Sequence, residues 1–243
     1  VYVEKPLALD LAGAKAIAAA AAAHGKQVMV GHLIRYHAAF IELQTQIAGG
    51  AVGRLRHIQA NRLAMGRIRN TESVLFDLCP HDLSLILALT GIEPQMVSCA
   101  GASHVTRGVV DTLSTVLGFE NGISATMQTS WMSPYKEHRL TVSGTAGSIV
   151  FDDTKPWPEK LVLFQDNIRP DGGNFIIERA SPVALPVAEA EPLKDEMRVF
   201  VESCTSGTST PSNIDEALAV QRTLETMQSV LVDMTISAPH SSI

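Results

Sequence analysis

The sequence predicts an α+β fold, in which an open, mostly antiparallel sheet carries helices on one face and follows a short βαβ unit. Three observations carry this prediction. The first thirty residues are typical of strand, helix and strand. Glycine-bearing turns then separate several strand-like runs in the middle of the chain. Two long helical segments close the sequence, and 46% apolar residues suffice for a core.

The first unit covers residues 1–31. Residues 1–3 are β-branched and aromatic, residues 9–24 are rich in alanine and end before Gly25, and residues 27–31 form a second apolar run. A strand, a helix and a strand of this length indicate a parallel crossover. Because two strands alone make no stable sheet, the unit is expected to belong to a larger doubly wound sheet.

The following segments are expected to alternate between helix and strand. Phe40, Leu43 and Ile47 recur at helical spacing, and Gly49-Gly50 closes that helix. The remaining expected elements are a strand over 55–64, a helix over 78–90 that stops at Gly91, strands over 113–119, 123–131, 139–144, 148–151, 160–164 and 174–180, and helices over 193–204 and 215 to about 236. Asn121-Gly122 and residues 145–147 mark two hairpins, and Asn213 or Asp215 is expected to cap the last helix.

Composition excludes several classes of protein. The net charge is −6 with no basic stripe, which argues against nucleic-acid binding. The longest purely apolar run, residues 16–23, is too short to cross a bilayer, and no targeting segment is visible. Cys79, Cys99 and Cys204 are odd in number and widely spaced, a pattern that fits a reducing cytoplasm and predicts neither a disulfide frame nor a metal site.

Three groups of side chains could carry chemistry. Lys5 follows a strand and precedes Pro6, where a cis peptide is possible and would aim the lysine; the alternative is an ordinary solvated lysine. Asp77 and His81 are four residues apart, so on a helix the carboxylate could orient the imidazole. The alternative there is structural, with Asp77 as an N-cap, Pro80 in the first turn and His81 packed in the core.

The third group lies at the end of a predicted hairpin strand. Trp131, Tyr135, Lys136 and Arg139 combine aromatic and cationic side chains, which could hold a sugar and an anionic group by stacking and ion pairing. The alternative is a polar sheet edge with an ordinary buried tryptophan.

The order of these motifs resembles one family. The EKP segment at residues 4–6, VGH-x-x-RY at 30–36, DLCPHDLSLILALTG at 77–91 and W-x-x-P-x-K at 131–136 are together similar to the Gfo/Idh/MocA family of NAD(P)-dependent sugar dehydrogenases. The resemblance implies that residues 1–36 are the C-terminal remnant of a Rossmann domain. It also implies that residues 37–243 are an α+β domain for substrate binding and oligomerisation, whose last helix packs back on the remnant.

The resemblance also implies roles for residues. Lys5, Asp77 and His81 would be catalytic: His81 as the general acid/base with a pKa near neutral, Asp77 to orient it, and Lys5 to stabilise negative charge on the reacting oxygen. The segment Glu4, Lys5 and Pro6 would border the cofactor. The candidates for lining the substrate pocket are Arg35, Tyr36, Trp131, Lys136 and Arg139.

The implied cofactor is NAD or NADP. No G-x-G-x-x-G occurs in the sequence, so the main pyrophosphate site is absent and the chain resembles a family member without its first portion. The implied substrate is a sugar or nucleotide sugar, and residues 151–153 look most like members acting on UDP-linked amino-sugar acids. A homo-oligomer, dimer or tetramer, is expected through the open sheet. The alternatives are an inert fragment that acts as a binding or dimerisation domain, and one part of an intact dehydrogenase.

Overall fold

The computed structural model describes residues 1–234, and its N-terminal part is the expected parallel crossover. Strand β1 (Tyr2–Val3) pairs in parallel with β2 (Met29–Val30), and helix α1 (Leu11–Ala23) connects them. The helix starts at Leu11 because the Asp10 side chain accepts a hydrogen bond from the Gly13 backbone N–H, which satisfies a free donor of the first turn.

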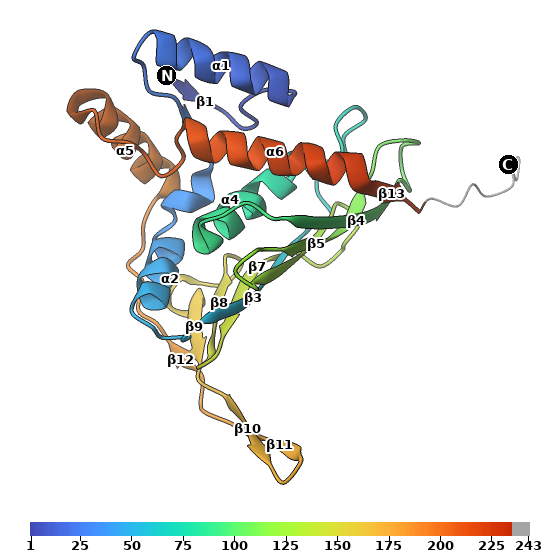
Figure 1. The fold of residues 1–243 in the computed structure, drawn as a ribbon, viewed down its shortest axis with the longest axis vertical. Coiled ribbons are helices and arrows are strands. Elements are labelled where there is room, and N and C mark those ends of the chain that lie inside the picture. Colours follow the sequence, from blue (N-terminus) through green and yellow to red (C-terminus); the bar gives the residue numbers. More distant parts are fainter. Residues whose placement is uncertain (235–243) are drawn as a thin grey trace, which may run out of the picture.

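The rest of the chain builds one large sheet with helices against it (Figure 1). The helical elements are the short η1 (Leu33–Tyr36) and η2 (Trp157–Glu159), with α2 (Ala38–Ala48), α3 (Val74–Asp77), α4 (Cys79–Thr90), α5 (Pro192–Ser206) and α6 (Ile214–Val230). The strands are β3 (Leu55–Leu63), β4 (Met96–Ala102), β5 (Thr112–Gly118), β6 (Ser124–Ser130), β7 (Glu137–Gly144), β8 (Ser148–Asp152), β9 (Leu161–Phe164), β10 (Asn167–Asp171), β11 (Asn174–Glu178), β12 (Val183–Ala184) and β13 (Leu231–Asp233).

The large sheet has nine strands in the order β12-β9-β8-β7-β3-β6-β5-β4-β13. Most neighbours are antiparallel, and the parallel pairs are β3 with β6 and β4 with β13. Helices α2, α4 and α6 lie over one face (Figure 1), so the expected α+β architecture is confirmed. The core lies between that face and the helices, where inward side chains of β5 and β6 meet Leu83 and Ile86 of α4.

Both expected hairpins are present. In the β5–β6 turn, Gly122 has a φ of 79°, a conformation that glycine adopts without steric cost, and the Asn121 side chain accepts a hydrogen bond from the Ile123 N–H. Strands β7 and β8 are joined through residues 145–147 as the sequence indicates. The predicted stop of α4 at Gly91 is confirmed, since Gly91 is in the left-handed region.

Strand β4, the short helix α3 and the short strand β12 were not among the expected elements. Two further segments also differ from the sequence prediction. The last helix was expected to run to about residue 236, but it ends at Val230 and residues 231–233 form β13 along the edge of β4; Ile236 itself lies outside the described residues. Strand β4 has an edge with free backbone N–H and C=O groups, and residues 231–233 pair with them. A continued helix would leave these groups of β4 unpaired. The second segment is β10, which pairs with β11 although it contains Pro170. Proline is tolerated there because both strands of this hairpin are edges.

The N-terminal unit is attached to the last helix. Leu7, Ala14 and Val30 form a small apolar cluster with Ala217 of α6. The Val30 N–H donates to the Ser212 carbonyl at 2.9 Å, just before α6 begins. This contact fixes the end of β2, and therefore the segment that follows it, relative to the large sheet. Within residues 1–234, no helix combines the length and apolar character that a membrane crossing requires.

Candidate functional site

Lys5 reaches from the end of β1 to the start of the α3–α4 segment. The Lys5–Pro6 peptide bond is cis. The Lys5 Nζ donates a hydrogen bond to the Asp77 carbonyl oxygen at 2.5 Å and lies 3.6 Å from the Asp77 carboxylate. Both side chains are largely shielded from solvent, with 17% and 13% of their surfaces exposed. Two segments that are seventy-two residues apart in sequence therefore share one polar contact.

The Asp77 carboxylate is held by donors on both oxygens. The Arg69 guanidinium donates to Oδ1 at 2.9 Å, and the Trp131 indole N–H donates to Oδ2 at 3.2 Å. Trp131 is buried, and its ring lies in the core cluster. Its polar atom is thus used to fix Asp77. A carboxylate held from three directions presents a fixed acceptor to the Lys5 ammonium.

The structural alternative for Asp77 is wrong in one respect. Asp77 is the last residue of α3, and the residue that caps α4 is Leu78, whose side chain makes no capping bond. Pro80 does occupy the first turn of α4, where its missing N–H costs nothing. Within residues 1–234, Asp77 forms no hydrogen bond with His81, so the expected orientation of the imidazole by this carboxylate is not what the contacts show.

His81 lies in the first turn of α4, and one nitrogen of its ring makes no hydrogen bond within the described residues. Its Nδ1 is enclosed and has no hydrogen-bond partner among the described residues. Burial lowers the pKa of His81 well below its ordinary value of 6.5, and the nearby positive groups Arg62 and Lys5 lower it further. The near-neutral pKa assumed from the sequence is therefore replaced by a lower one. At neutral pH the imidazole is uncharged and can accept a proton.

Beside His81, a buried ion pair joins α4 to the sheet. The Arg62 guanidinium donates to Asp82 Oδ1 from Nε at 3.0 Å and from Nη2 at 2.7 Å, and both side chains are almost fully buried. Sequence reasoning missed this pair. The available signal was alternation, because Ile58, Ala60 and Arg62 occupy the same, inward face of β3. A charged residue in that series predicts a buried partner.

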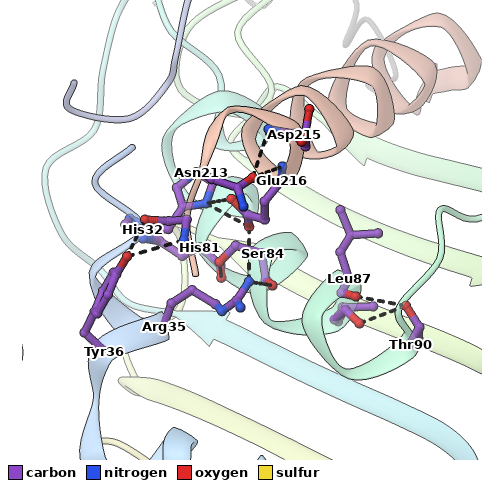
Figure 2. Close-up of polar contacts among 12 residues, drawn as sticks. His32, Arg35, Tyr36, His81, Ser84, Leu87, Thr90, Asn213, Asp215 and Glu216 are labelled. Atoms are coloured by element: carbon purple, nitrogen blue, oxygen red, sulfur yellow. Dashed lines mark hydrogen bonds and ion pairs between the residues drawn. The ribbon is translucent and has the colours of Figure 1, made fainter. Parts of the chain in front are cut away.

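The segment after β2 is tied to α4 and α6 by charged groups (Figure 2). His32 Nδ1 lies 2.9 Å from the Glu216 carboxylate, and Arg35 Nη1 lies 3.4 Å from the same side chain. Arg35 also donates to the Ser84 carbonyl oxygen at 3.3 Å. Burial lowers the pKa of Arg35, which Glu216 partly offsets. These contacts were not expected from the sequence. His32 also lies close enough to His81 to contribute, after burial, Arg62 and Lys5, to the lowered pKa of His81.

Tyr36 is buried, and its hydroxyl pairs with the Ser212 hydroxyl at 2.7 Å. With this bond and those of His32 and Arg35, residues 32–36 are fastened to the start of α6 and to α4. The polar atoms of Arg35 and Tyr36 therefore bind other protein groups at the junction between residues 1–36 and the sheet. The role that these contacts show for Arg35 and Tyr36 is to hold the two parts of the structure together.

The remaining predicted site residues lie in the β6–β7 turn and at the start of β7. Tyr135 and Lys136 are exposed there. Arg139 pairs with Glu137 at 2.5 Å and stands opposite Asn61 in the sheet register. Since side chains alternate along a strand, Arg139 points to the opposite face of the sheet from Arg62 and His138. The structure thus brings Lys5, Asp77, Trp131 and His81 into one region, and it does not bring Arg139 there.

A second buried carboxylate lies behind β1. Glu196 of α5 is 1% exposed, and its Oε2 lies 3.2 Å from the Tyr2 hydroxyl. Burial raises the pKa of Glu196 to about 7. Glu4 reaches the same hydroxyl at 3.3 Å, so Tyr2 stands between two carboxylates. These groups attach α5 to β1, the strand that precedes Lys5.

In chemical terms, the region combines an ammonium group, an uncharged imidazole and a fixed carboxylate. The ammonium can hydrogen-bond an oxygen that gains negative charge, and the imidazole can take up a proton. Among the described residues no cluster of histidine, cysteine and acidic side chains could hold a metal ion. The arrangement is therefore suited to proton transfer at a polar oxygen.

Comparison with known proteins places the chain in a family. Residues 40–150 match the model of the GFO/IDH/MocA C-terminal domain. A crystal structure from Magnetospirillum magnetotacticum MS-1, which carries only a provisional oxidoreductase name, is 31% identical and has a TM-score of 0.79; the match covers 93% of this chain and 71% of that one.

Two curated relatives match over shorter stretches. UDP-N-acetylglucosamine 3-dehydrogenase from Acidithiobacillus ferrooxidans is 35% identical over 129 residues, which is 53% of this chain and 40% of that protein. The scyllo-inositol 2-dehydrogenase (NAD(+)) of Bacillus subtilis is 27% identical, over 61% of this chain and 47% of that protein. The matched part thus spans less than half the length of these two relatives. Together with the fold, the matches show that the chain belongs to the Gfo/Idh/MocA family of oxidoreductases.

Proposed function

We propose that this chain forms the substrate-binding and catalytic part of an NAD(P)-dependent oxidoreductase. The reaction moves a hydride between the nicotinamide and a secondary hydroxyl of a sugar or nucleotide sugar. The observation that supports this most is the contact of Lys5 with Asp77, four residues before His81 in the chain. Burial, Arg62 and Lys5 together lower the pKa of the imidazole. The names of the relatives agree, since UDP-N-acetylglucosamine and scyllo-inositol both carry ring hydroxyls.

In the oxidation direction, each residue has a distinct task. His81 accepts the proton of the hydroxyl group, which its low pKa permits because the ring is uncharged at neutral pH. Lys5 hydrogen-bonds the same oxygen and stabilises the negative charge that develops there. Asp77 holds the Lys5 ammonium, while Arg69 and Trp131 hold Asp77. Asp77 is therefore a positioning residue for the amine.

The cofactor would meet this chain at its nicotinamide end. When bound, the nicotinamide supplies the hydride acceptor or donor, which no protein side chain can replace. Glu4, Lys5 and Pro6 are the residues that would border it. His81 Nδ1 is buried and has no hydrogen-bond partner among the described residues. A polar group of the bound cofactor or substrate would supply that partner. The sequence contains no glycine-rich loop for the pyrophosphate, so these residues alone do not form a complete dinucleotide site.

Three further features belong to the same proposal. Lys136, exposed on the β6–β7 turn, is the candidate cation for binding an anionic group of a nucleotide sugar. Two copies of the chain pair through the uncovered face of the large sheet. A cytoplasmic location agrees with Cys79, Cys99 and Cys204, which are all free thiols.

The experiment begins with the coding sequence upstream of Val1, read for a G-x-G-x-x-G segment. The polypeptide that includes any such segment is then assayed with NAD and NADP against inositols and UDP-amino sugars. His81→Asn and Lys5→Met are expected to lower turnover at least a hundredfold. Arg139→Met, on the opposite sheet face, serves as the matched control and should retain activity.

The competing function is a binding or dimerisation domain without catalysis. The uncovered sheet face favours it, since that surface can pair with another copy without any cofactor. Absence of cofactor binding and of turnover in every version of the polypeptide would select this alternative. Wild-type turnover in both His81→Asn and Lys5→Met would remove the assignment of these residues even if the protein is an enzyme.

A further inference from the structure

The hairpin formed by β10 and β11 extends away from the rest of the molecule (Figure 1). It leaves the sheet after β9 and returns to it at β12, which pairs with β9. A two-stranded hairpin is only marginally stable without a surface to pack on. Its sequence should therefore show whether it is built to remain in solvent or to bind something.

The strand register separates the hairpin into two unlike faces. Ile168 stands opposite Ile177 and Pro170 opposite Phe175, so these four apolar side chains share one face. Phe175 is 73% exposed, Ile168 65% and Ile177 53%. No other described element covers this face, which we call the hairpin apolar face.

The opposite face carries charges that are paired within the hairpin. On this face Arg169 lies 2.6 Å from Glu178. At the base of the hairpin, just outside the two strands, Arg179 lies 2.8 Å from Asp166. These pairs leave little uncompensated charge beside the hairpin apolar face. An acidic chain with a net charge of −6 can therefore bring two copies together here without strong repulsion.

The area that a contact between two copies would bury indicates which surfaces must take part in it. If a phenylalanine offers roughly 200 Å² and an isoleucine slightly less, the hairpin apolar face exposes roughly 350 Å². Two hairpins against each other would bury roughly 700 Å², below the ~1,000 Å² expected of a specific interface. The uncovered face of the nine-stranded sheet adds roughly 700 Å² per copy, from ~4.8 Å between strands and ~17 Å along them. Together they reach the size of a stable dimer.

We infer that the β10–β11 hairpin is a docking arm that packs its apolar face on a second copy of this chain, beside the paired sheet faces. This inference rests on the proposed pairing of copies through the sheet and adds a distinct contact to it. A two-fold arrangement supplies each copy with one arm and one receiving surface. The arm explains why four apolar side chains gather on one face of the hairpin, whereas the other face carries the Arg169–Glu178 ion pair.

The test compares neighbouring residues on opposite hairpin faces by sedimentation velocity of the full chain. Ile177→Glu places a charge on the hairpin apolar face and should raise the dimer dissociation constant at least roughly thirtyfold. Ile176→Glu is the matched control, because Ile176 lies on the other face opposite Arg169, and it should change the constant less than about twofold. Circular dichroism should show both variants folded.

Two results would overturn the inference, and they differ in what else they remove. A dimer that Ile177→Glu leaves unchanged would reject the arm and keep the pairing through the sheet. A wild-type chain that stays monomeric up to high micromolar concentration would reject both.

Discussion

Replacing Arg62 by methionine is the perturbation whose cost can be worked out most directly. The Arg62 and Asp82 side chains are only 8% and 5% exposed, and two guanidinium nitrogens donate to one carboxylate oxygen at 3.0 and 2.7 Å. Arg62→Met leaves Asp82 charged, buried and without its partner. Breaking a buried pair from one side costs about 3–5 kcal/mol, a large part of the ~5–15 kcal/mol that stabilises a typical protein.

Urea unfolding measures this cost through the shift in midpoint at constant slope. Arg139→Met is the control, because Arg139 is exposed and its pair with Glu137 should contribute less than about 1 kcal/mol. The double variant Arg62→Met/Asp82→Leu removes both charges and should recover most of the loss. A loss below about 1 kcal/mol for Arg62→Met, or one equal to that of Arg139→Met, would refute the buried-pair reasoning.

Three further changes test other parts of the structure. Burial raises the pKa of Glu196 to about 7, so the folded chain holds this proton more tightly than the unfolded chain does. The free energy of unfolding should therefore fall by about 2 kcal/mol between pH 5 and pH 8. Glu196→Gln should remove that fall in urea titrations. Asn213→Ala should cost about 1 kcal/mol in the same assay, because Asn213 accepts two N–H bonds at the start of α6, whereas exposed Asn70→Ala should cost almost nothing. Gly144→Ala should lower the thermal midpoint, because a Cβ there would lie 2.2 Å from a backbone oxygen, while Gly66→Ala meets open space.

Much of the fold could be predicted because local signals and tertiary packing agree. Asn121-Gly122 favours a hairpin, and Gly91 ends a helix that is buried on several sides. The end of α6 was mispredicted because a helical pattern cannot show that the edge of β4 is open to pair with residues 231–233. Strand β10 was likewise not predicted, because it contains Pro170 and a proline is compatible with a strand only where that strand lies at an edge.

The candidate site was accessible from sequence only in part. Motif order pointed to Lys5, Asp77 and His81, but spacing alone suggested that Asp77 orients His81, whereas the contacts tie Asp77 to Lys5 and Trp131. The groups that surround the imidazole come from segments far apart in the chain. No local pattern reports that Arg62 lies beside it.

The central claim, that Lys5 and His81 share one site, is tested most directly by an NMR titration of the His81 ring in the full chain. The structure predicts that His81 titrates below 6.5 and that Lys5→Met raises its pKa, while Lys26→Met, at an exposed lysine, leaves it unchanged. A His81 pKa at or above 6.5 that does not respond to Lys5→Met would contradict the account.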